Sequence, residues 1–333
     1  DNNYASQYQS GSENTALIDQ TTASDNNSAV QSQYGSFNDA AVTQHGTEHY
    51  SYQYQSGTSN VANTLQYYGT DNDSRTWSIG TGNYVDVYQY SGTENSTTVD
   101  QYGNGNVAYS RQYGGSDNSI SITQGDRLYP GYSFSPGNYA YASQSGSSNT
   151  ADITQQGSGY NYSYSQQYGT GHSATVFQDG DYNYAYSYQS GTGHTSDVTQ
   201  VGDYNDSVIY QTNTGNSATV SQTGDNNDAY VDQLFSAGSY NTAEVTQTGD
   251  WNNADIDQNG DFNTATAYQY GNNNSIEVDQ FGNGNTSYNT QYSHNDGLIT
   301  VSQVGDSHYS SVFQGYGSAN VATVDQTDFN QTA

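Results

Sequence analysis

Asn149-Thr150-Ala151-Asp152-Ile153-Thr154-Gln155-Gln156-Gly157 is the stretch that decides the fold, and it has the pattern N-x-A-x-V/I-x-Q-x-G. Side chains of an extended strand point alternately to opposite faces. Asn149, Ala151, Ile153 and Gln155 therefore lie on one face, and the residues between them lie on the other. Gly157 then permits a turn. The stretch predicts a short β-strand that ends in a turn.

The same segment recurs along almost the whole chain. We call each copy, from its Asn position to its Gln position, an arm. There are 28 arms, and they begin at residues 3, 14, 27, 38, 49, 60, 72, 83, 95, 106, 118, 138, 149, 161, 172, 183, 194, 205, 216, 227, 241, 252, 263, 274, 285, 297, 308 and 320. Of the 27 steps between arms, 18 are eleven residues long, and the extra residues of the longer steps fall in turns. Such a fixed period indicates a solenoid.

Four alternate positions of the arm are nearly constant. The first is Asn in 23 arms, with His49, His172, His194, His308 and Gly297 in the others, and the last is Gln except at Ser78. Ala or Ser, and then Val or Ile, usually stand between them. Constant residues at alternate positions indicate a closely packed interior, whereas the variable positions face outward. Two arms that face each other would make one coil of about 22 residues.

The predicted fold is therefore all-β: a two-strand-per-coil β-solenoid, which is a stack of β-arches with cross-β geometry and about fourteen coils. Each interior amide could bond to the same residue one coil away. The expected interior ladder residues are Asn149, Ala151, Ile153, Gln155, Gln178, Gln200, Asn216, Gln222, Asn252 and Gln258. The expected turn glycines are Gly146, Gly157, Gly180, Gly202 and Gly224.

We predict a single solenoid domain over residues 1–333 with an inserted loop at 125–137. The step from Asn118 to Asn138 is twenty residues long and contains Pro130 and Pro136. Proline cannot donate to a strand ladder, so this segment should bulge out of the stack. A tolerated insertion is favoured over a binding loop.

Composition excludes several classes of protein. Hydrophobic residues make up only 31%, and 33 acidic residues stand against three arginines, which gives a net charge of -30. That balance is typical of disorder, but the strict period argues against it. Because the net charge is negative, we expect neither nucleic acids nor anionic membrane surfaces as partners. There is no cysteine, hence no disulfide and no thiolate metal site.

No apolar run is long enough for a membrane-spanning helix or a signal peptide, so we expect no membrane insertion. The opening Asp1-Asn2-Asn3 resembles the interior turn Asp225-Asn226-Asn227, so we expect that a preceding segment has been removed. The first and last arms carry no proline or lysine, so we expect both ends of the stack to be open to strand addition.

The outward faces are expected to differ along the chain. Arms two steps apart should stack on one sheet, which would bring Tyr139, Tyr162 and Tyr184 into one ladder. Later arms of the same parity carry Asp255, Asp257, Glu277 and Asp279 instead. The sequence thus predicts an aromatic stretch and an acidic stretch.

The spacing in Gln144-Ser145-Gly146-Ser147-Ser148-Asn149-Thr150-Ala151, continuing to Gln155, resembles the curlin repeat of the major subunit of bacterial curli fibres. The resemblance covers nearly the whole chain apart from the loop. It implies a secreted functional amyloid that is exported through an outer-membrane pore, nucleated by a minor subunit and polymerised into biofilm matrix. Familiar short members have about five repeats, whereas this chain has about fourteen and also carries the proline loop.

Enzymatic and calcium-binding functions fit the sequence less well. Only six histidines accompany the acids, and four of them stand at the Asn position, so we predict neither an enzyme nor a cofactor. Gly-Asp recurs at 125, 180, 202, 224, 249, 260 and 305, but the nonapeptide of calcium-binding β-rolls, with two adjacent glycines and a fixed Asp, is absent. These aspartates are read as turn formers, and weak cation binding is left open.

The alternative is a monomeric ice-binding or adhesive β-solenoid, which would need one residue type repeated on a flat face. The prediction is a structural subunit that assembles end to end with copies of itself into an extracellular, cell-surface fibre. Such a fibre would support biofilm matrix, surface adhesion and cell aggregation.

Overall fold

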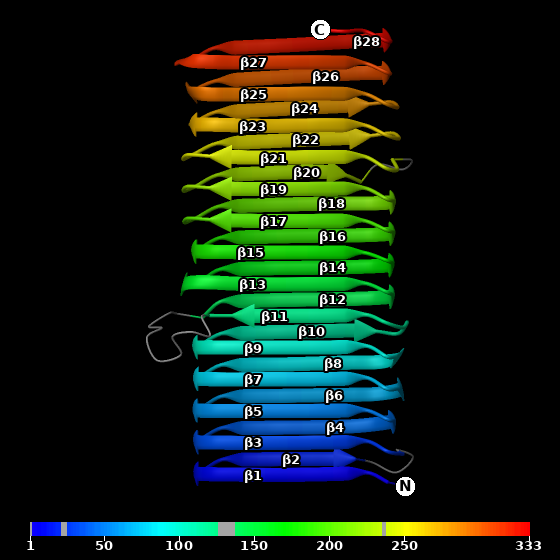
Figure 1. The fold of residues 1–333 in the computed structure, drawn as a ribbon, viewed down its shortest axis with the longest axis vertical. Helices are drawn as coiled ribbons and strands as arrows, with labels where there is room; N and C mark the ends of the chain where they lie inside the picture. Colours follow the sequence, from blue (N-terminus) through cyan, green and yellow to red (C-terminus); the bar gives the residue numbers. More distant parts are fainter. Residues whose placement is uncertain (1, 21–24, 126–136, 235–237) are drawn as a thin grey trace. The chain divides into compact units, whose positions relative to one another are not determined.

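A computed structural model describes residues 2–20, 25–125, 137–234 and 238–333. Within these ranges the regular elements are 28 β-strands, and there is no helix. The chain divides into two compact units, Asp1–Gly171 and His172–Ala333. Figure 1 shows the strands of each unit stacked one above the other.

The first unit contains two sheets of parallel strands. One sheet has the order β1 (Tyr4–Ser12), β3 (Ser28–Ser36), β5 (Tyr50–Thr58), β7 (Asp73–Thr81), β9 (Ser96–Asn104), β11 (Ser119–Gln124) and β13 (Thr150–Gly159). The other has the order β2 (Thr15–Gln20), β4 (Asp39–Thr47), β6 (Val61–Thr70), β8 (Tyr84–Thr93), β10 (Val107–Tyr113), β12 (Tyr139–Ser147) and β14 (Tyr162–Thr170). Consecutive strands of the chain therefore lie in different sheets.

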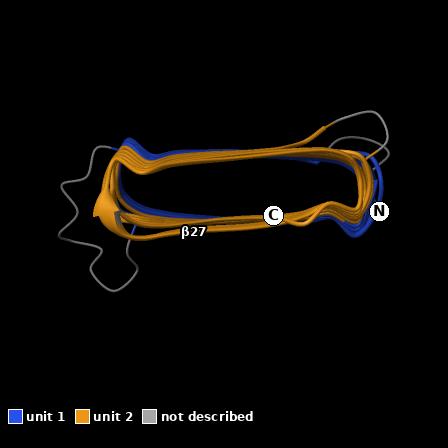
Figure 2. Cartoon of the chain, turned by 90° about the horizontal axis from the view of Figure 1, so that it is seen from above, with its two compact units in different colours: residues 1–171 blue, residues 172–333 orange. Residues whose placement is uncertain are grey.

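The second unit repeats this arrangement. One sheet consists of β15 (Ser173–Asp181), β17 (Thr195–Val201), β19 (Ser217–Thr223), β21 (Thr242–Thr248), β23 (Thr264–Asn272), β25 (Thr286–Asn295) and β27 (Tyr309–Ser318). The other consists of β16 (Tyr184–Thr192), β18 (Asp206–Thr214), β20 (Asp228–Gln233), β22 (Asn253–Asn259), β24 (Ser275–Phe281), β26 (Leu298–Asp306) and β28 (Val321–Phe329). Seen end on, each unit has two flat layers joined by turns (Figure 2). The predicted all-β solenoid with two strands per coil is confirmed.

Each of the 28 strands begins one residue after the first residue of a predicted arm. The Asn position belongs to the turn, and its carbonyl accepts the first N–H of the strand one coil before, as in the 2.8 Å bond from Tyr84 N to Asn106 O. Gln200 bonds to Gln222 and Gln66 to Gln89, so most coils take 22 or 23 residues, close to the predicted 22.

The insertion lengthens one coil without disturbing the register on either side. Gln112 bonds to Gln144 although the two residues are 32 apart in the chain. Residues 126–136 of the predicted loop lie outside the described residues, so the role of the loop and the single-domain boundary stay predictions.

The core of each unit is a thin double layer of small and β-branched side chains. Inward and outward positions alternate along most strands, and Ala151, Ile153, Ala174 and Val176 are at most 1% exposed. Fully burying a side chain of the size of Val or Ile contributes about 1.5 to 3 kcal/mol. The interior therefore depends on these apolar rows together with the buried amides that flank them.

Candidate functional site

The asparagines that open the arms form buried ladders along each stack. The backbone N–H and Nδ2 of Asn149 both donate to Oδ1 of Asn118, one coil away, at 3.1 Å. Nδ2 also donates to the carbonyl oxygen of Gly169 at 3.0 Å. Asn252 makes the same bonds in the second unit, and Oδ1 of Asn216 accepts the N–H of the next asparagine at 2.9 Å. One side chain thus satisfies backbone groups of two neighbouring turns.

The glutamines that close the arms form a second set of ladders. Nε2 of Gln178 donates to Oε1 of Gln200 at 2.8 Å, and Gln200 donates to Gln222 at 2.9 Å. Gln258 donates to the glutamine one coil further on at 2.9 Å. A buried amide left unpaired costs about 1 to 3 kcal/mol. A shift of register between coils would break these bonds and leave buried amides unpaired. Each rung therefore stabilises the observed register.

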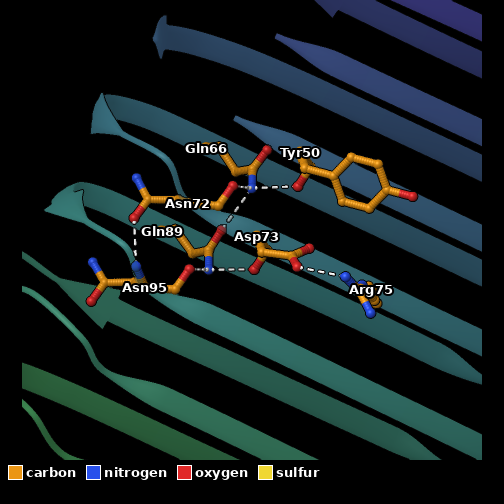
Figure 3. A network of polar contacts seen from close by, with 7 residues as sticks. All are labelled: Tyr50, Gln66, Asn72, Asp73, Arg75, Gln89 and Asn95. Atoms are coloured by element: carbon orange, nitrogen blue, oxygen red, sulfur yellow. Dashed lines mark hydrogen bonds and ion pairs between the residues drawn. The ribbon is translucent and has the colours of Figure 1, made fainter. Parts of the chain in front are cut away.

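The same glutamines also join the two sheets. Nε2 of Gln155 donates to the carbonyl oxygen of Tyr139 in the facing sheet at 2.9 Å. Figure 3 shows Gln66 reaching the carbonyl oxygens of Tyr50 at 2.9 Å and Asn72 at 2.7 Å. The repeat pattern predicts amide bonds along the stack but gives no sign of these bonds across it. They anchor the end of one arm to the start of the arms opposite.

A further glutamine ladder replaces the apolar row near the N-terminus. Gln7, Gln31 and Gln53 stand where other arms carry Val or Ile, and each donates to the next at 2.9 Å. Gln31 also donates to the carbonyl oxygen of Leu17 in the facing sheet at 2.9 Å. The signal for this ladder is present in the sequence as two interior glutamines in each of these arms.

Four arms begin with a buried histidine: His49, His172, His194 and His308. Nδ1 of His194 accepts the backbone N–H of Asn216 at 3.1 Å, and Nε2 lies 3.1 Å from the carbonyl oxygen of Ser190. These partners assign the neutral tautomer with its proton on Nε2, so Nδ1 replaces the asparagine oxygen and Nε2–H replaces the amide. Burial, and then the ring of His172 at 5.0 Å, lower the pKa of His194 to about 4.

The turn glycines are required by the close approach of neighbouring coils. Gly146, Gly157, Gly180, Gly202 and Gly224 have φ angles between +93° and +128°. A Cβ placed on Gly202 would lie 2.2 Å from the carbonyl oxygen of Gly224. The backbone conformation and the lack of space therefore both exclude a side chain.

The aspartates after these glycines are part of a ladder that the sequence reasoning missed. Oδ1 of Asp203 accepts the N–H of Asp181 at 2.8 Å, Oδ1 of Asp225 accepts that of Asp203 at 2.8 Å, and Oδ1 of Asp250 accepts that of Asp225 at 3.0 Å. Asn272 continues the row by accepting from Asp250 at 2.8 Å. The sequence signal for this ladder is the regular recurrence of Gly-Asp. The carboxylates of these aspartates accept hydrogen bonds from turn N–H groups one coil before.

These ladders and turns recur at the spacing of a known repeat. A family model described as the curlin associated repeat matches residues 92–125, 137–157, 173–202, 214–249, 249–282 and 295–327, which together are more than half of the chain. The chain belongs to the curlin-repeat family. Among curated proteins, none matches the chain. Curlin-repeat proteins are extracellular and structural rather than enzymatic.

The outward aromatic residues of the curlin arms lie where the register predicts. Tyr139 of β12 stacks on Tyr162 of β14, with ring centroids 4.3 Å apart and ring planes at 10°. Tyr184 occupies the same position of its arm, at the start of β16 in the second unit. The step of the ladder that joins Tyr162 to Tyr184 stays a prediction.

The outward acids of the later curlin arms lie in register on β22 and β24. Asp255 is opposite Glu277, and Asp257 is opposite Asp279. Burial, and then Glu277 and Asp279, raise the pKa of Asp255 to about 6. Burial, and then Asp255 and Asp232, raise the pKa of Asp257 to about 7, and burial likewise raises the pKa of Asp279. The carboxyl groups of Asp255 and Asp257 are therefore not fully ionised at neutral pH.

In the part of the chain that the structure describes, no group of three or more His, Cys, Asp or Glu side chains is placed to hold a metal ion. Nor does that part contain a helix that could span a membrane. Most residues with buried polar contacts belong to the ladders, so the candidate site of the curlin stack is the repeated surface that each coil offers to the next.

Proposed function

We propose that the chain is the structural subunit of an extracellular, curli-like amyloid fibre and that it assembles end to end with further copies of itself. In that role the fibre supports biofilm matrix, adhesion to surfaces and cell aggregation. The family also implies secretion by a bacterium with an outer membrane, a dedicated export pore in that membrane and a subunit that nucleates the fibre.

The observation that carries the proposal is the constant register of the amide ladders. In the second unit, Gln178, Gln200 and Gln222 follow one another with rungs of 2.8 and 2.9 Å, and β15, β17 and β19 pair residue for residue without a shift of register. A coil that ends a stack offers the same donors, acceptors and shape to any coil of another copy. Joining two molecules thus repeats a contact that each already makes within itself.

Family membership supports the same conclusion independently, because curlin repeats imply self-assembly into fibres. The acidic faces explain how a chain built for stacking stays soluble before it assembles. Repulsion between like charges slows the approach of two molecules until a favourable end contact forms.

The test is to leave purified protein to stand and to follow thioflavin fluorescence, with electron microscopy and fibre diffraction at the end. We expect fibres with a meridional spacing of about 4.8 Å, the strand spacing of a sheet that runs along the fibre axis. Sonicated fibres should remove the lag. Protein that stays monomeric with and without such seeds would overturn the proposal.

One observation favours the alternative of an ice-binding monomer. A row of hydroxyls runs in register along one outer face of the second unit, at Ser173, Thr195, Ser217, Thr242, Thr264 and Thr286. The row beside it contains Asp197 and Glu244, whose charges interrupt a uniform surface. Thermal hysteresis in a solution of the monomer would favour the alternative, and we expect none.

A further inference from the structure

Two pairs of tyrosines lie face to face on neighbouring coils, one pair in each unit. The rings of Tyr139 and Tyr162 have centroids 4.3 Å apart and planes at 10°. The rings of Tyr182 and Tyr204 have centroids 4.9 Å apart and planes at 0°. Tyr67 and Tyr90 on neighbouring coils are also nearly parallel, at 14°, but their centroids are 6.1 Å apart. Other, closer tyrosine contacts between coils are tilted or edge-on, as the one between Tyr141 and Tyr164 at 43°. Parallel rings at this distance are therefore a special feature of the two pairs.

The backbone holds each pair in place. Tyr139 and Tyr162 are partners at the first position of β12 and β14. Tyr182 and Tyr204 stand in equivalent turns, both with φ of 58°, and the N–H of Tyr204 donates to the carbonyl oxygen of Asp181 at 2.9 Å. Because the two backbones of a pair have the same conformation one coil apart, their side chains leave in the same direction.

The rings are also accessible to a reagent in solution. Tyr182 is 46% exposed and Tyr204 is 55% exposed, and Tyr139 and Tyr162 are half-buried on the outer face of their sheet. Burial, and then a hydrogen bond and the charge of Tyr164, raise the pKa of Tyr139. Its phenol is therefore protonated at neutral pH, and an electron must leave together with the phenolic proton.

We propose that these two pairs are sites of oxidative cross-linking, at which a one-electron oxidant joins the two rings as dityrosine. Each tyrosine loses one electron and its phenolic proton to become a neutral phenoxyl radical. The two radicals share their unpaired electrons in a carbon–carbon bond between ring positions ortho to the oxygens. The hydrogen on each bonded carbon then moves to the phenol oxygen, which restores both aromatic rings.

The overall reaction releases two electrons and two protons, and hydrogen peroxide, acting through a haem peroxidase, takes them up as two molecules of water. In the product, the centroids of the joined rings are one carbon–carbon bond and two ring radii apart. That distance is close to the 4.3 Å that already separates Tyr139 and Tyr162. The rings must turn to meet edge to edge, but their centres need to move little.

Such a bond would tie neighbouring coils together covalently. Residues 182 and 204 belong to successive coils of one stack, so their cross-link would close a loop of the length of one coil. Closing that loop restricts the unfolded chain and leaves the register of the native strands unchanged. The proposed modification is independent of whether the stack joins other copies.

The chain contains its own negative control. Tyr240 and Phe262 stand in equivalent turns with φ of 57° and 60°, and their rings lie parallel at 9° with centroids 5.3 Å apart. Phenylalanine has no phenol oxygen and forms no phenoxyl radical, so this pair should stay unlinked. Phe262→Tyr should make it a third site.

The experiment treats the dilute, full-length protein with hydrogen peroxide and a haem peroxidase. Dityrosine fluorescence is followed, and cross-linked peptides are mapped by mass spectrometry after proteolysis. We expect links between positions 139 and 162 and between 182 and 204, with a yield per molecule that does not change on dilution. Tyr204→Phe should abolish the second link, Tyr240→Phe should alter neither, and Phe262→Tyr should add a link between positions 240 and 262.

Two results would overturn the proposal. One is a set of links that follows exposure alone, for example links dominated by Tyr316, which is 78% exposed. The other is a product that forms mainly between molecules and vanishes on dilution. The Phe262→Tyr variant keeps the test decisive because it depends on the gain of a link rather than on the loss of one.

Discussion

At the scale of single residues, the asparagine position shows how strictly the stack selects hydrogen-bonding chemistry. The position needs an acceptor for the N–H of the next coil and a donor for a carbonyl of its own turn. Asn216 supplies both through its amide, and His194 supplies both through one imidazole tautomer. A protonated histidine has no acceptor, so the substitution makes the ladder sensitive to acid.

We therefore predict that His194→Asn makes the fold less sensitive to acid. The pKa of His194 is about 4 in the folded chain, against about 6.5 in the unfolded chain. As pH falls, the unfolded state binds the proton first, so the stabilisation is complete above pH 6.5 and is lost as pH falls towards 4. The loss between pH 7 and 4 should be smaller in the variant by on the order of 1 to 2 kcal/mol.

Urea unfolding of both proteins at pH 7 and pH 4 measures this difference. The acidic side chains are the same in the two proteins, so their own titration cancels in the comparison. An identical loss of stability in both proteins would contradict the role assigned to the imidazole.

The glutamine rungs give a second prediction at this scale. Gln178→Ala, Gln200→Ala and Gln222→Ala together remove consecutive rungs. They leave a neighbouring amide and carbonyl groups without hydrogen-bond partners. We expect the triple variant to lose several kcal/mol of unfolding free energy, at about 1 to 3 kcal/mol for each unsatisfied group. Its fibres should also form more slowly, as followed by thioflavin fluorescence.

The matched control changes outward side chains of the same strands: Thr175→Ser, Thr199→Ser and Thr219→Ser. Surface substitutions of this kind usually alter stability by no more than about 0.5 kcal/mol each. Equal urea midpoints and equal lag times for the two triple variants would refute the assignment of inside and outside.

At the scale of the turn, residues with positive φ occupy two positions that tolerate different side chains. The residue just before nearly every arm lies in the left-handed region, and even Trp251 is accommodated there at φ of 61°. The turn glycine two or three residues earlier, such as Gly202, lies against the next coil instead. Left-handed backbone alone is thus tolerated, whereas left-handed backbone in contact with a neighbouring carbonyl is restricted to glycine.

This difference predicts a larger loss of stability for one Gly→Ala change than for another. Gly202→Ala combines φ of 114° with a contact of 2.2 Å to a backbone oxygen, and should cost about 3 kcal/mol or more. Gly193→Ala has φ of 67° and nothing within 4 Å of the new Cβ, and should cost about 1 to 2 kcal/mol. Urea unfolding ranks the two variants, and a Gly193→Ala protein as unstable as Gly202→Ala would contradict the account.

At the scale of the whole molecule, charge opposes the stacking that the ladders favour. The chain carries a net charge of -30. On β22 and β24, like charges are direct neighbours across the sheet, and like charges opposite each other are destabilising. Burial and mutual repulsion raise the pKa values of Asp255 and Asp257 to about 6 and about 7.

We predict that neutralising Asp255, Asp257 and Asp279 to Asn, and Glu277 to Gln, shortens the lag of fibre formation at pH 7. The unchanged protein should assemble faster as pH falls or salt rises. The folded pKa values are raised, so the stability contributed by the protonated acids is complete below about pH 3.8 and is lost as pH rises through 6 to 7. The neutralised variant should show a flatter response to pH and to salt, because it has fewer charges to protonate or screen.

Thioflavin kinetics over a series of pH values and salt concentrations check this prediction. A neutralised protein with the same lag and the same salt response would show that these acids serve only as a solubilising coat.

Much of this fold could be predicted because its determinants are local. The start of each strand, the inward direction of Gln200 and the pairing of Asp255 with Glu277 all follow from a period of two within the arm and a regular step between arms. The bond from Gln66 to Tyr50 could not be predicted, because it depends on how far the two sheets stand apart. The Asp181–Asp203 contact was missed because it depends on the shape of the turn.

By itself, the sequence determined that the chain is a two-strand-per-coil solenoid with amide ladders inside and variable faces outside. Both follow from the alternation of constant and variable residues within each arm and from the regular spacing between arms. Only the tertiary structure decided which tyrosine rings lie parallel, which histidine nitrogen carries the proton and which glycines touch the next coil. Those properties belong to atoms that meet from residues about one coil apart, and their distances are set by the packing of whole coils rather than by any one arm.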